Sequence, residues 1–397
     1  MRSLHIYCND LVKNSDSLIR SCTIEARDGK RITSSKVLKY ELPNSILLPK
    51  NDDAEAYIIA TIMLAMAEKR TLKVHGSVSR TLLSNLTEFR DAWNCWLPDL
   101  YHRIDFEATT VDDSVVTKTN RAIAAFSGGL DSTFTVWQNT QKLAGYRTQA
   151  IKACVMVHGF DIFKEDEFLS AYNTAQETLN TVNIPLYSLR TNYRSIIELN
   201  WNHTHGIALA ACLNNFKQLY STGIIAGSFT YAMSYYPHGS NPITDLLLSS
   251  SSLKILHDGA QFTKNQKVVG ISKWTRGVNN LRVCYSAEQK HKNCGKCHKC
   301  IRTRMVFEAN GLKIPKSLSD LRNGKAIRKL ILRRRILEIL FVQTLRLSKA
   351  NNIRIRFKWS YYYMIYKSRI LRAILKPQIV RSIGRKLYNI LKGEQLT

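Results

Sequence analysis

The chain has 397 residues, with 58 lysines and arginines against 30 aspartates and glutamates, which gives a formal net charge of +28. Apolar residues make up 45% and aromatic residues 9%, a composition that excludes a wholly disordered, collagen-like or coiled-coil chain and suits two or three folded domains. A charge this basic favours a polyanionic partner: nucleic acid, nucleotide or an anionic membrane.

Residues 1–120 are predicted to form a small α/β module. The alternation and length of its apolar runs predict strands at 4–7, 22–27, 37–42 and 72–75 and helices at 54–69 and 77–96. The first eight residues lack the apolar run of a signal peptide, and no later run approaches the length of a spanning helix. We therefore expect a cytoplasmic protein.

From residue 121 a regular alternation of strands and helices begins. Strands are expected at 122–126, 150–157, 184–189 and 223–226, and helices at 132–142, 165–180 and 205–216. Strands that alternate with helices of this length form parallel sheets covered on both faces. The prediction for 121–312 is thus an α/β domain of this kind, with a loop-rich segment at 228–283.

A glycine loop follows the first strand of this domain and reads Ser127-Gly128-Gly129-Leu130-Asp131-Ser132-Thr133. Glycines let the backbone approach a ligand closely, and the free amide groups at a helix N-terminus bind phosphate. The three hydroxyl groups add donors, while Asp131 could hold Mg²⁺ or orient the loop. The motifs of P-loop NTPases and of dinucleotide-binding folds are absent. The alternative interpretation is a serine-capped helix after a glycine turn.

Three other polar segments are weaker candidates. Val157, His158 and Asp161 end the second strand and are expected to line a nucleotide pocket; a polar strand end that caps the sheet is the alternative. The segment around Asp258 is a turn signal, and a loop there could bring Lys264 or Lys267 to a phosphate. His203 and His205 are expected in a helix N-cap region rather than at a metal.

Nine cysteines are present, and four of them lie within 17 residues: Cys284, Cys294, Cys297 and Cys300. In a reducing compartment such crowding indicates a metal site rather than disulfides. Four thiolates form the closed, tetrahedral sites of structural Zn²⁺, and an iron–sulfur cluster is the rival. We predict a structural zinc knuckle.

The Ser-Gly-Gly-x-Asp-Ser string after an apolar strand resembles the pyrophosphate-binding loop of the PP-loop ATP pyrophosphatase superfamily. The resemblance implies an adenine nucleotide alpha-hydrolase-like fold, with ATP and Mg²⁺ as cofactors. These enzymes adenylate a substrate oxygen, release pyrophosphate, and let a nucleophile displace AMP. The resemblance further implies that the whole loop, from Ser127 to Thr133, binds ATP, and that Asp131, Ser127 and Ser132 are catalytic residues. Val157 and His158 would then lie beside the nucleotide.

The order of glycine loop and cysteine knuckle also resembles the 7-cyano-7-deazaguanine synthase family, which converts a carboxylate to a nitrile with ATP and ammonia. A third segment resembles the substrate loop of that family, and its expected substrate-binding residues are Ser228, Tyr231, Tyr235 and Tyr236. The family carries aspartates where this chain has Thr230 and His238. We therefore expect the same chemistry on a different small-molecule or peptide acceptor.

The C-terminal region, 313–397, is expected to be helical and basic. Residues 321–397 contain 20 lysines and arginines and two acidic residues, a net charge of +18, which leaves +10 for residues 1–320. Apolar residues between 326 and 349 follow one helical face, and arginines with tyrosines follow them. This pattern favours an anionic membrane surface, which would place the protein peripherally on the inner membrane; RNA binding and a plain packed subdomain are the alternatives.

The leading functional hypothesis is an ATP-dependent adenylating ligase that activates a carboxylate or amide for attack by ammonia or an amine. Two alternatives remain open. One is a PP-loop enzyme that modifies tRNA, with the tail on RNA; the other is a non-catalytic nucleotide-binding scaffold at the membrane.

Overall fold

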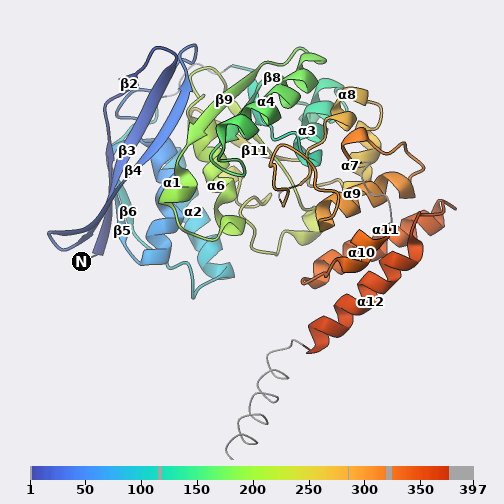
Figure 1. The fold of residues 1–397 in the computed structure, drawn as a ribbon. Helices are drawn as coiled ribbons and strands as arrows, with labels where there is room; N and C mark the ends of the chain where they lie inside the picture. The colour runs from blue at the N-terminus through green and yellow to red at the C-terminus, as the bar shows by residue number, and fades with distance from the viewer. Residues whose placement is uncertain (1, 115–118, 285, 319–323, 375–397) are drawn as a thin grey trace, which may run out of the picture. The chain divides into compact units, whose positions relative to one another are not determined.

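The computed structural model describes residues 2–114, 119–284, 286–318 and 324–374 (Figure 1). The chain divides into two compact units. The first comprises Met1–Tyr285 with Gln289–Lys292, and the second comprises Ser286–Glu288 with Asn293–Thr397.

An eleven-stranded sheet runs through the first unit, in the order β11-β10-β7-β8-β9-β4-β3-β1-β5-β6, with β2 paired to β3. The strands are β1 Arg2–Cys8, β2 Val12–Lys13, β3 Ser17–Asp28, β4 Arg31–Pro43, β5 Thr71–Val78, β6 Phe106–Val111, β7 Ala122–Ala125, β8 Ile151–His158, β9 Leu186–Thr191, β10 Thr222–Ala226 and β11 Lys254–Asp258.

The pairing directions divide this sheet into two parts. Strands β7, β8, β9 and β10 pair parallel with one another, as predicted, and β11 adds a further parallel strand beside β10. β3 pairs antiparallel with β1 and β4, and β4 pairs antiparallel with β9, with Tyr40 opposite Thr191. Through this β4–β9 pair, segments 1–120 and 121–312 share one continuous sheet.

Helices cover both faces of the parallel strands, which confirms the predicted α/β class. The helices of this unit are α1 Glu55–Glu68, α2 Arg80–Trp96, α3 Leu130–Thr140, α4 Glu165–Asn180, α5 Tyr193–Ile196, α6 Trp201–Asn214, α7 Lys264–Ile271 and α8 Thr275–Asn279, with 3₁₀ turns η1 Gly145–Arg147, η2 Tyr231–Met233 and η3 Leu246–Leu248. Alternate residues of β7 point to opposite faces: Ile123 packs in a core with α1 and α6, whereas Ala122 and Ala124 pack in a second core with α3 and α4.

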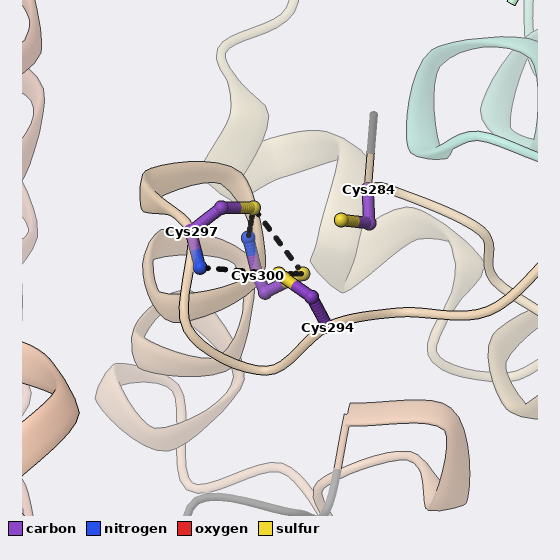
Figure 2. Close-up of side chains that lie close together, drawn as sticks. All are labelled: Cys284, Cys294, Cys297 and Cys300. Atoms are coloured by element: carbon purple, nitrogen blue, oxygen red, sulfur yellow. Dashed lines mark hydrogen bonds between the residues drawn. The ribbon is translucent and has the colours of Figure 1, made fainter. Parts of the chain in front are cut away.

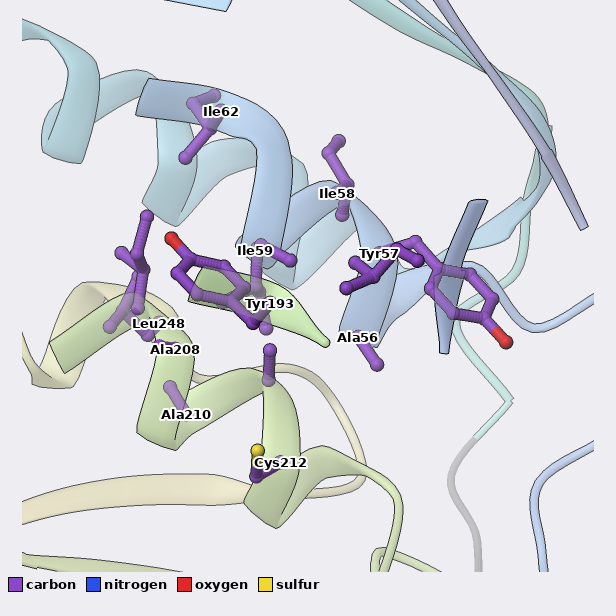
Figure 3. Close-up of a cluster of buried hydrophobic side chains, with 14 of the residues drawn as sticks. Ala56, Tyr57, Ile58, Ile59, Ile62, Tyr193, Ala208, Ala210, Cys212 and Leu248 are labelled. Carbon is purple, nitrogen blue, oxygen red and sulfur yellow. The ribbon is translucent and has the colours of Figure 1, made fainter. Parts of the chain in front are cut away.

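The larger core includes buried side chains of α1 and α6, which lie in one cluster (Figure 3). α1 contributes Ile58, Ile59 and Ile62, and α6 contributes Ala208 and Cys212, all fully buried. The small residues of α6 let the two helices approach closely, so α1 of the N-terminal segment is packed directly against the parallel-strand region.

The segment 228–283, predicted to be loop-rich, is more regular than expected, since it contains β11, α7 and α8. β11 has only five residues, Lys254–Asp258, and three of them are polar or charged. A strand this short carries little periodic signal, and it exists because it extends the sheet beside β10.

Helix α2 is anchored at its N-terminus by Ser79. The Ser79 hydroxyl accepts a hydrogen bond from the Leu82 amide (3.3 Å) and donates one to Glu55 Oε1 (2.5 Å). The other carboxylate oxygen of Glu55 accepts a hydrogen bond from buried Lys217 Nζ at 2.6 Å. The Ser79 hydroxyl thus caps helix α2 and also donates a hydrogen bond to the carboxylate of a buried ion pair.

We expect Ser79→Ala to lower the free energy of unfolding by about 1–2 kcal/mol, because it removes the cap and one donor to a buried carboxylate. Urea denaturation of the full chain measures this. Thr81→Ala, at an exposed position of the same helical turn, is the matched control and should change stability by less than about 0.5 kcal/mol. Equal effects of the two substitutions would contradict the assignment.

The second unit is helical, with α9 His298–Ala309, α10 Lys325–Lys329, α11 Arg335–Ala350, α12 Lys358–Ile374 and the 3₁₀ turn η4 Lys316–Leu318. These four helices share a core that includes Met305, Ile327, Phe341 and Met364. Among the helices that the structure describes, none combines the length and the apolar character needed to traverse a lipid bilayer.

The apolar face expected over 326–349 is split between α10 and α11. The helix stops after Lys329 because Leu332 turns into the core, where its side chain is fully buried. The amide group of Leu332 donates to Ser368 Oγ (2.9 Å), and its carbonyl group accepts a hydrogen bond from Arg372 (2.5 Å). Contacts with α12 thus replace the intrahelical hydrogen bonds at the break.

Candidate functional site

The glycine loop occupies the turn between β7 and α3, at the carboxyl edge of the parallel strands. Gly128 has a φ of +70°, a left-handed conformation that a side chain would strain, and Gly129 is the N-cap residue of α3. Ser132 Oγ accepts a hydrogen bond from the Ser127 amide (3.3 Å) and donates one to the Gly129 carbonyl (3.2 Å). The glycine turn therefore occurs here, at the edge where α/β sheets bind ligands, but the serine cap does not, because the N-cap residue is Gly129 and no side chain caps the helix.

Asp131, in the first turn of α3, pairs with two lysines from α7. Lys267 Nζ lies 2.9 Å from Asp131 Oδ1 and donates to the Gly227 carbonyl at 2.5 Å, and Lys264 forms an ion pair with Asp131 Oδ2. The ends of β7 and β10 and the start of α7 are thereby joined. Both lysines were candidates in the sequence, and the structure brings both to the glycine loop.

The electrostatics of this group keep Asp131 ionised. Burial raises the pKa of the carboxyl group, but the charges of Lys264 and Lys267 outweigh burial and hold the pKa well below its ordinary value. Two cations on a single carboxylate leave a local excess of positive charge beside the N-terminus of α3. That arrangement suits a bound anion.

A capping box fixes the start of α7, which carries the two lysines. Thr263 Oγ1 accepts a hydrogen bond from the Gln266 amide (3.3 Å), and Gln266 Oε1 accepts one from the Thr263 amide (2.9 Å). The first turn of α7 is therefore held before any ligand contacts it.

We expect Thr263→Ala to cost about 1 kcal/mol of local stability, and hydrogen exchange in the first turns of α7 to accelerate about fivefold. Thr263→Ser keeps the hydroxyl group and is the matched control. Exchange that is unchanged in the alanine variant, or equally fast in both variants, would show that the cap does not hold α7.

Arg282 is a loop-binding residue that the sequence did not reveal. Its Nε and Nη2 atoms lie 3.2 and 3.0 Å from the Ser127 carbonyl oxygen, and its backbone amide donates to the Gly128 carbonyl at 2.8 Å. The contact spans 155 positions of the chain, so no local pattern could have predicted it.

The end of β8 is built differently from the glycine loop. His158 is buried, stacks on Phe168 with ring centroids 4.5 Å apart, and places Nε2 3.1 Å from the Phe163 carbonyl oxygen. Val157 packs against the core on the other face of the sheet. The contacts of His158 therefore lie within the β8–α4 connection, where it secures the turn.

The tyrosine segment follows β10 at the same edge of the sheet. Tyr231, Tyr235 and Tyr236 are 50%, 73% and 41% exposed, and Ser228 is also exposed. The Tyr231 amide donates to the Ala260 carbonyl (3.0 Å), and its hydroxyl lies 3.5 Å from Arg147 Nη1. Three phenol groups are thus available to a ligand.

A cavity of about 310 Å³ opens along β10 and β11, next to the tyrosine segment. Its lining residues are Tyr146, Arg147, Gln149, Ile224, Lys254, Leu256, His257 and Asp258. Two cations, Arg147 and Lys254, face this space, while Asp258 Oδ2 accepts a hydrogen bond from Gln138 Nε2 at 2.5 Å. The turn signal at Asp258 coincides with the end of β11: Asp258 is the last residue of the strand, and Gly259 follows it with a φ of +89°.

The four clustered cysteines come together as predicted, and their sulfur atoms all lie within 4.8 Å of one another (Figure 2). Cys297 Sγ lies 3.5 Å from Cys300 Sγ, and Cys294 Sγ lies 4.0 Å from it. Sulfur atoms around a tetrahedral Zn²⁺ with bonds of about 2.3 Å are about 3.8 Å apart, so the spacing fits a metal such as zinc.

Backbone geometry supports this cysteine group. Cys297 is the N-cap residue of α9, and its sulfur accepts a hydrogen bond from the Cys300 amide at 3.5 Å. The Cys297 amide in turn donates to Cys294 Sγ at 3.3 Å, across a turn in which Gly295 has a φ of +67°. Amide donors of this kind stabilise thiolates, which are the metal-binding form of cysteine.

Comparisons with known proteins give no relative for this chain: no family model matches it, and neither the curated proteins nor the solved structures contain a match.

Proposed function

We propose that the chain is an ATP-dependent adenylating ligase of the PP-loop type, whose glycine loop binds the pyrophosphate portion of ATP. The observation that carries the proposal is the Asp131 cluster, in which Lys264 and Lys267 meet the start of α3 at the carboxyl edge of the parallel strands. A glycine turn, a helix N-terminus and the partly exposed ammonium group of Lys264 together suit a pyrophosphate group.

The reaction has two steps. A carboxylate or amide oxygen of the acceptor attacks the α-phosphorus of ATP, and the bond to the bridging oxygen breaks with release of pyrophosphate. Ammonia or an amine then attacks the activated carbon and expels AMP. Negative charge grows on the leaving pyrophosphate in the first step, where Lys264 and the amide groups of the loop would stabilise it.

The residues take distinct roles in this scheme. Lys264 has a 23% exposed side chain and can reach a phosphate, whereas Lys267 has a 1% exposed side chain and acts as a positioning residue for Asp131. Ser127, Ser132 and Thr133 supply hydroxyl groups. Because Asp131 already holds two lysines, we propose that Mg²⁺ enters with the nucleotide, mainly on its phosphate oxygens.

The acceptor would bind beside the tyrosine segment. Arg147 and Lys254 line the adjoining cavity, and both suit an acceptor that carries a carboxylate. The three tyrosines offer stacking surfaces and hydroxyl groups. In this proposal the four cysteines hold a structural Zn²⁺, because four thiolates leave no ligand position open for water.

The experiment is to follow ATP labelled at the α-phosphate, with ammonium and a panel of small carboxylate acceptors, and to identify the labelled product. We expect labelled AMP together with pyrophosphate, and Asp131→Asn measured in parallel to give far less. Labelled ADP as the product, or equal AMP from both proteins, would overturn the proposal.

A further inference from the structure

Helix α12 has two apolar faces on opposite sides, and only one of them is used in packing. The inward face carries Tyr361, Met364, Ile365 and Ser368, which are between 0% and 5% exposed. These residues follow the helical spacing i, i+3, i+4 and i+7 and join the core of the second unit.

The outward face is a continuous stripe of aromatic and aliphatic side chains, which we call the α12 stripe. It consists of Trp359, Tyr362, Tyr363, Tyr366, Ile370 and Ile374. Trp359 is 82% and Tyr366 is 66% exposed, and the other four are between 41% and 52% exposed. Single exposed apolar residues are ordinary, but a stripe of six along one helix marks an interaction surface.

The helix is held firmly, so the stripe has a fixed position on the second unit. Arg369 Nε lies 2.6 Å from Glu338 Oε1 of α11, and Arg372 pairs with the other oxygen of that carboxylate. Ser368 Oγ accepts a hydrogen bond from the Leu332 amide at 2.9 Å. These contacts fix the rotation of α12 about its axis.

Cations flank the stripe on both sides. Lys358 Nζ lies 6.0 Å from the ring centroid of Tyr362, and Lys367 Nζ lies 5.6 Å from that of Tyr363. Arg369 keeps 58% of its side chain exposed despite its ion pair. Lysine and arginine beside tyrosine and tryptophan are typical of helices that lie in the headgroup layer, with their apolar face toward the acyl chains.

We propose that the α12 stripe docks the protein on an anionic bilayer surface. The charge is complementary, since residues 321–397 carry a net +18. RNA fits less well, because Ile370 and Ile374 offer no ring on which a base can stack. A second copy fits less well too, because a two-fold contact along the stripe would bring its flanking cations together.

The test is flotation of the full-length protein with vesicles of phosphatidylcholine, alone or with about one third phosphatidylglycerol. We expect binding to the anionic vesicles only, and expect the triple variant Trp359→Ser, Tyr363→Ser, Tyr366→Ser to bind at least about tenfold more weakly. Ile331→Ser with Ile339→Ser, at exposed positions of the same unit outside the stripe, is the matched control and should bind as the wild type does.

A second variant tests the electrostatic part. Lys358→Gln with Lys367→Gln should weaken binding to anionic vesicles by about fivefold for each lost charge. Unchanged melting temperatures of all variants show that the fold is intact.

Four results would overturn the proposal. They are no flotation of the wild type, equal flotation of the triple variant, equal binding to neutral vesicles, and a stripe-dependent dimer or RNA complex formed without vesicle binding.

Discussion

Asp131→Asn is expected to reduce the rate of AMP formation by about 10²–10³-fold. The substitution removes the charge that holds Lys264 and Lys267 at the glycine loop while keeping the size of the side chain. Lys264 then loses the position from which it would stabilise the leaving pyrophosphate. Steady-state assays of AMP formation at saturating ATP measure the effect.

The control for this substitution is Asp166→Asn, which removes the same charge from an exposed position in the first turn of α4. It should leave the rate within about twofold of the wild type. Since the pKa of Asp131 is held well below its ordinary value, its carboxylate stays ionised at neutral pH, and the pH–rate profile should show no step from it in that region. An Asp131→Asn enzyme with nearly wild-type activity would remove Asp131 from the mechanism.

The second large effect is expected at the cysteine group. Purified protein should contain about one Zn²⁺ per chain, and Cys300→Ser should reduce this to near zero. Because metal affinity of this kind is coupled to folding, the loss should also lower the melting temperature, by about 10 °C or more. Cys300 is buried and its helix contributes to the core of the second unit, so the effect should exceed that of an ordinary surface change.

Elemental analysis and thermal unfolding measure both quantities on the same samples. Cys95→Ser is the matched control, because Cys95 is an exposed cysteine outside the group. This variant should have the zinc content and the melting temperature of the wild type. Absorption near 400 nm with bound iron would instead identify an iron–sulfur cluster. Absence of any metal in the wild type would leave the cysteine group without the proposed role.

The sequence predicted best where the signal was local and periodic. The expected helix at 165–180 is α4, Glu165–Asn180, and the expected strand at 150–157 is β8, Ile151–His158. Apolar strands and amphipathic helices of this length bury large areas, so their pattern alone specifies them.

Features that depend on distant contacts were not predictable in the same way. The pairing of β4 with β9 joins Tyr40 to Thr191, and nothing in either strand identifies its partner. The break before α11 depends on Ser368 and Arg372, which lie more than 35 residues further along the chain. Short-range patterns carry no information about such pairs.

In the candidate site, too, local motifs were predictable and contacts between distant residues were not. The glycine loop and the four cysteines are local motifs, and the structure has the loop between β7 and α3 and the four sulfur atoms together. The contact of Arg282 with the Ser127 carbonyl comes from tertiary packing of the loop after α8, and the pairing of Lys264 and Lys267 with Asp131 comes from the packing of α7. The sequence suggested the lysines but could not show that both reach a single carboxylate.

The measurement that tests the central claim most directly is calorimetric titration of the full chain with α,β-methylene-ATP and Mg²⁺, since binding requires no acceptor. We predict saturable binding of one nucleotide, weakened about tenfold by Lys264→Met, which removes the proposed phosphate contact at a side chain that is 23% exposed. Lys273→Met, which removes a charge outside the site, should bind as the wild type does. An absence of binding, or equal affinity in the Lys264→Met protein, would contradict the assignment of the glycine loop as an ATP site.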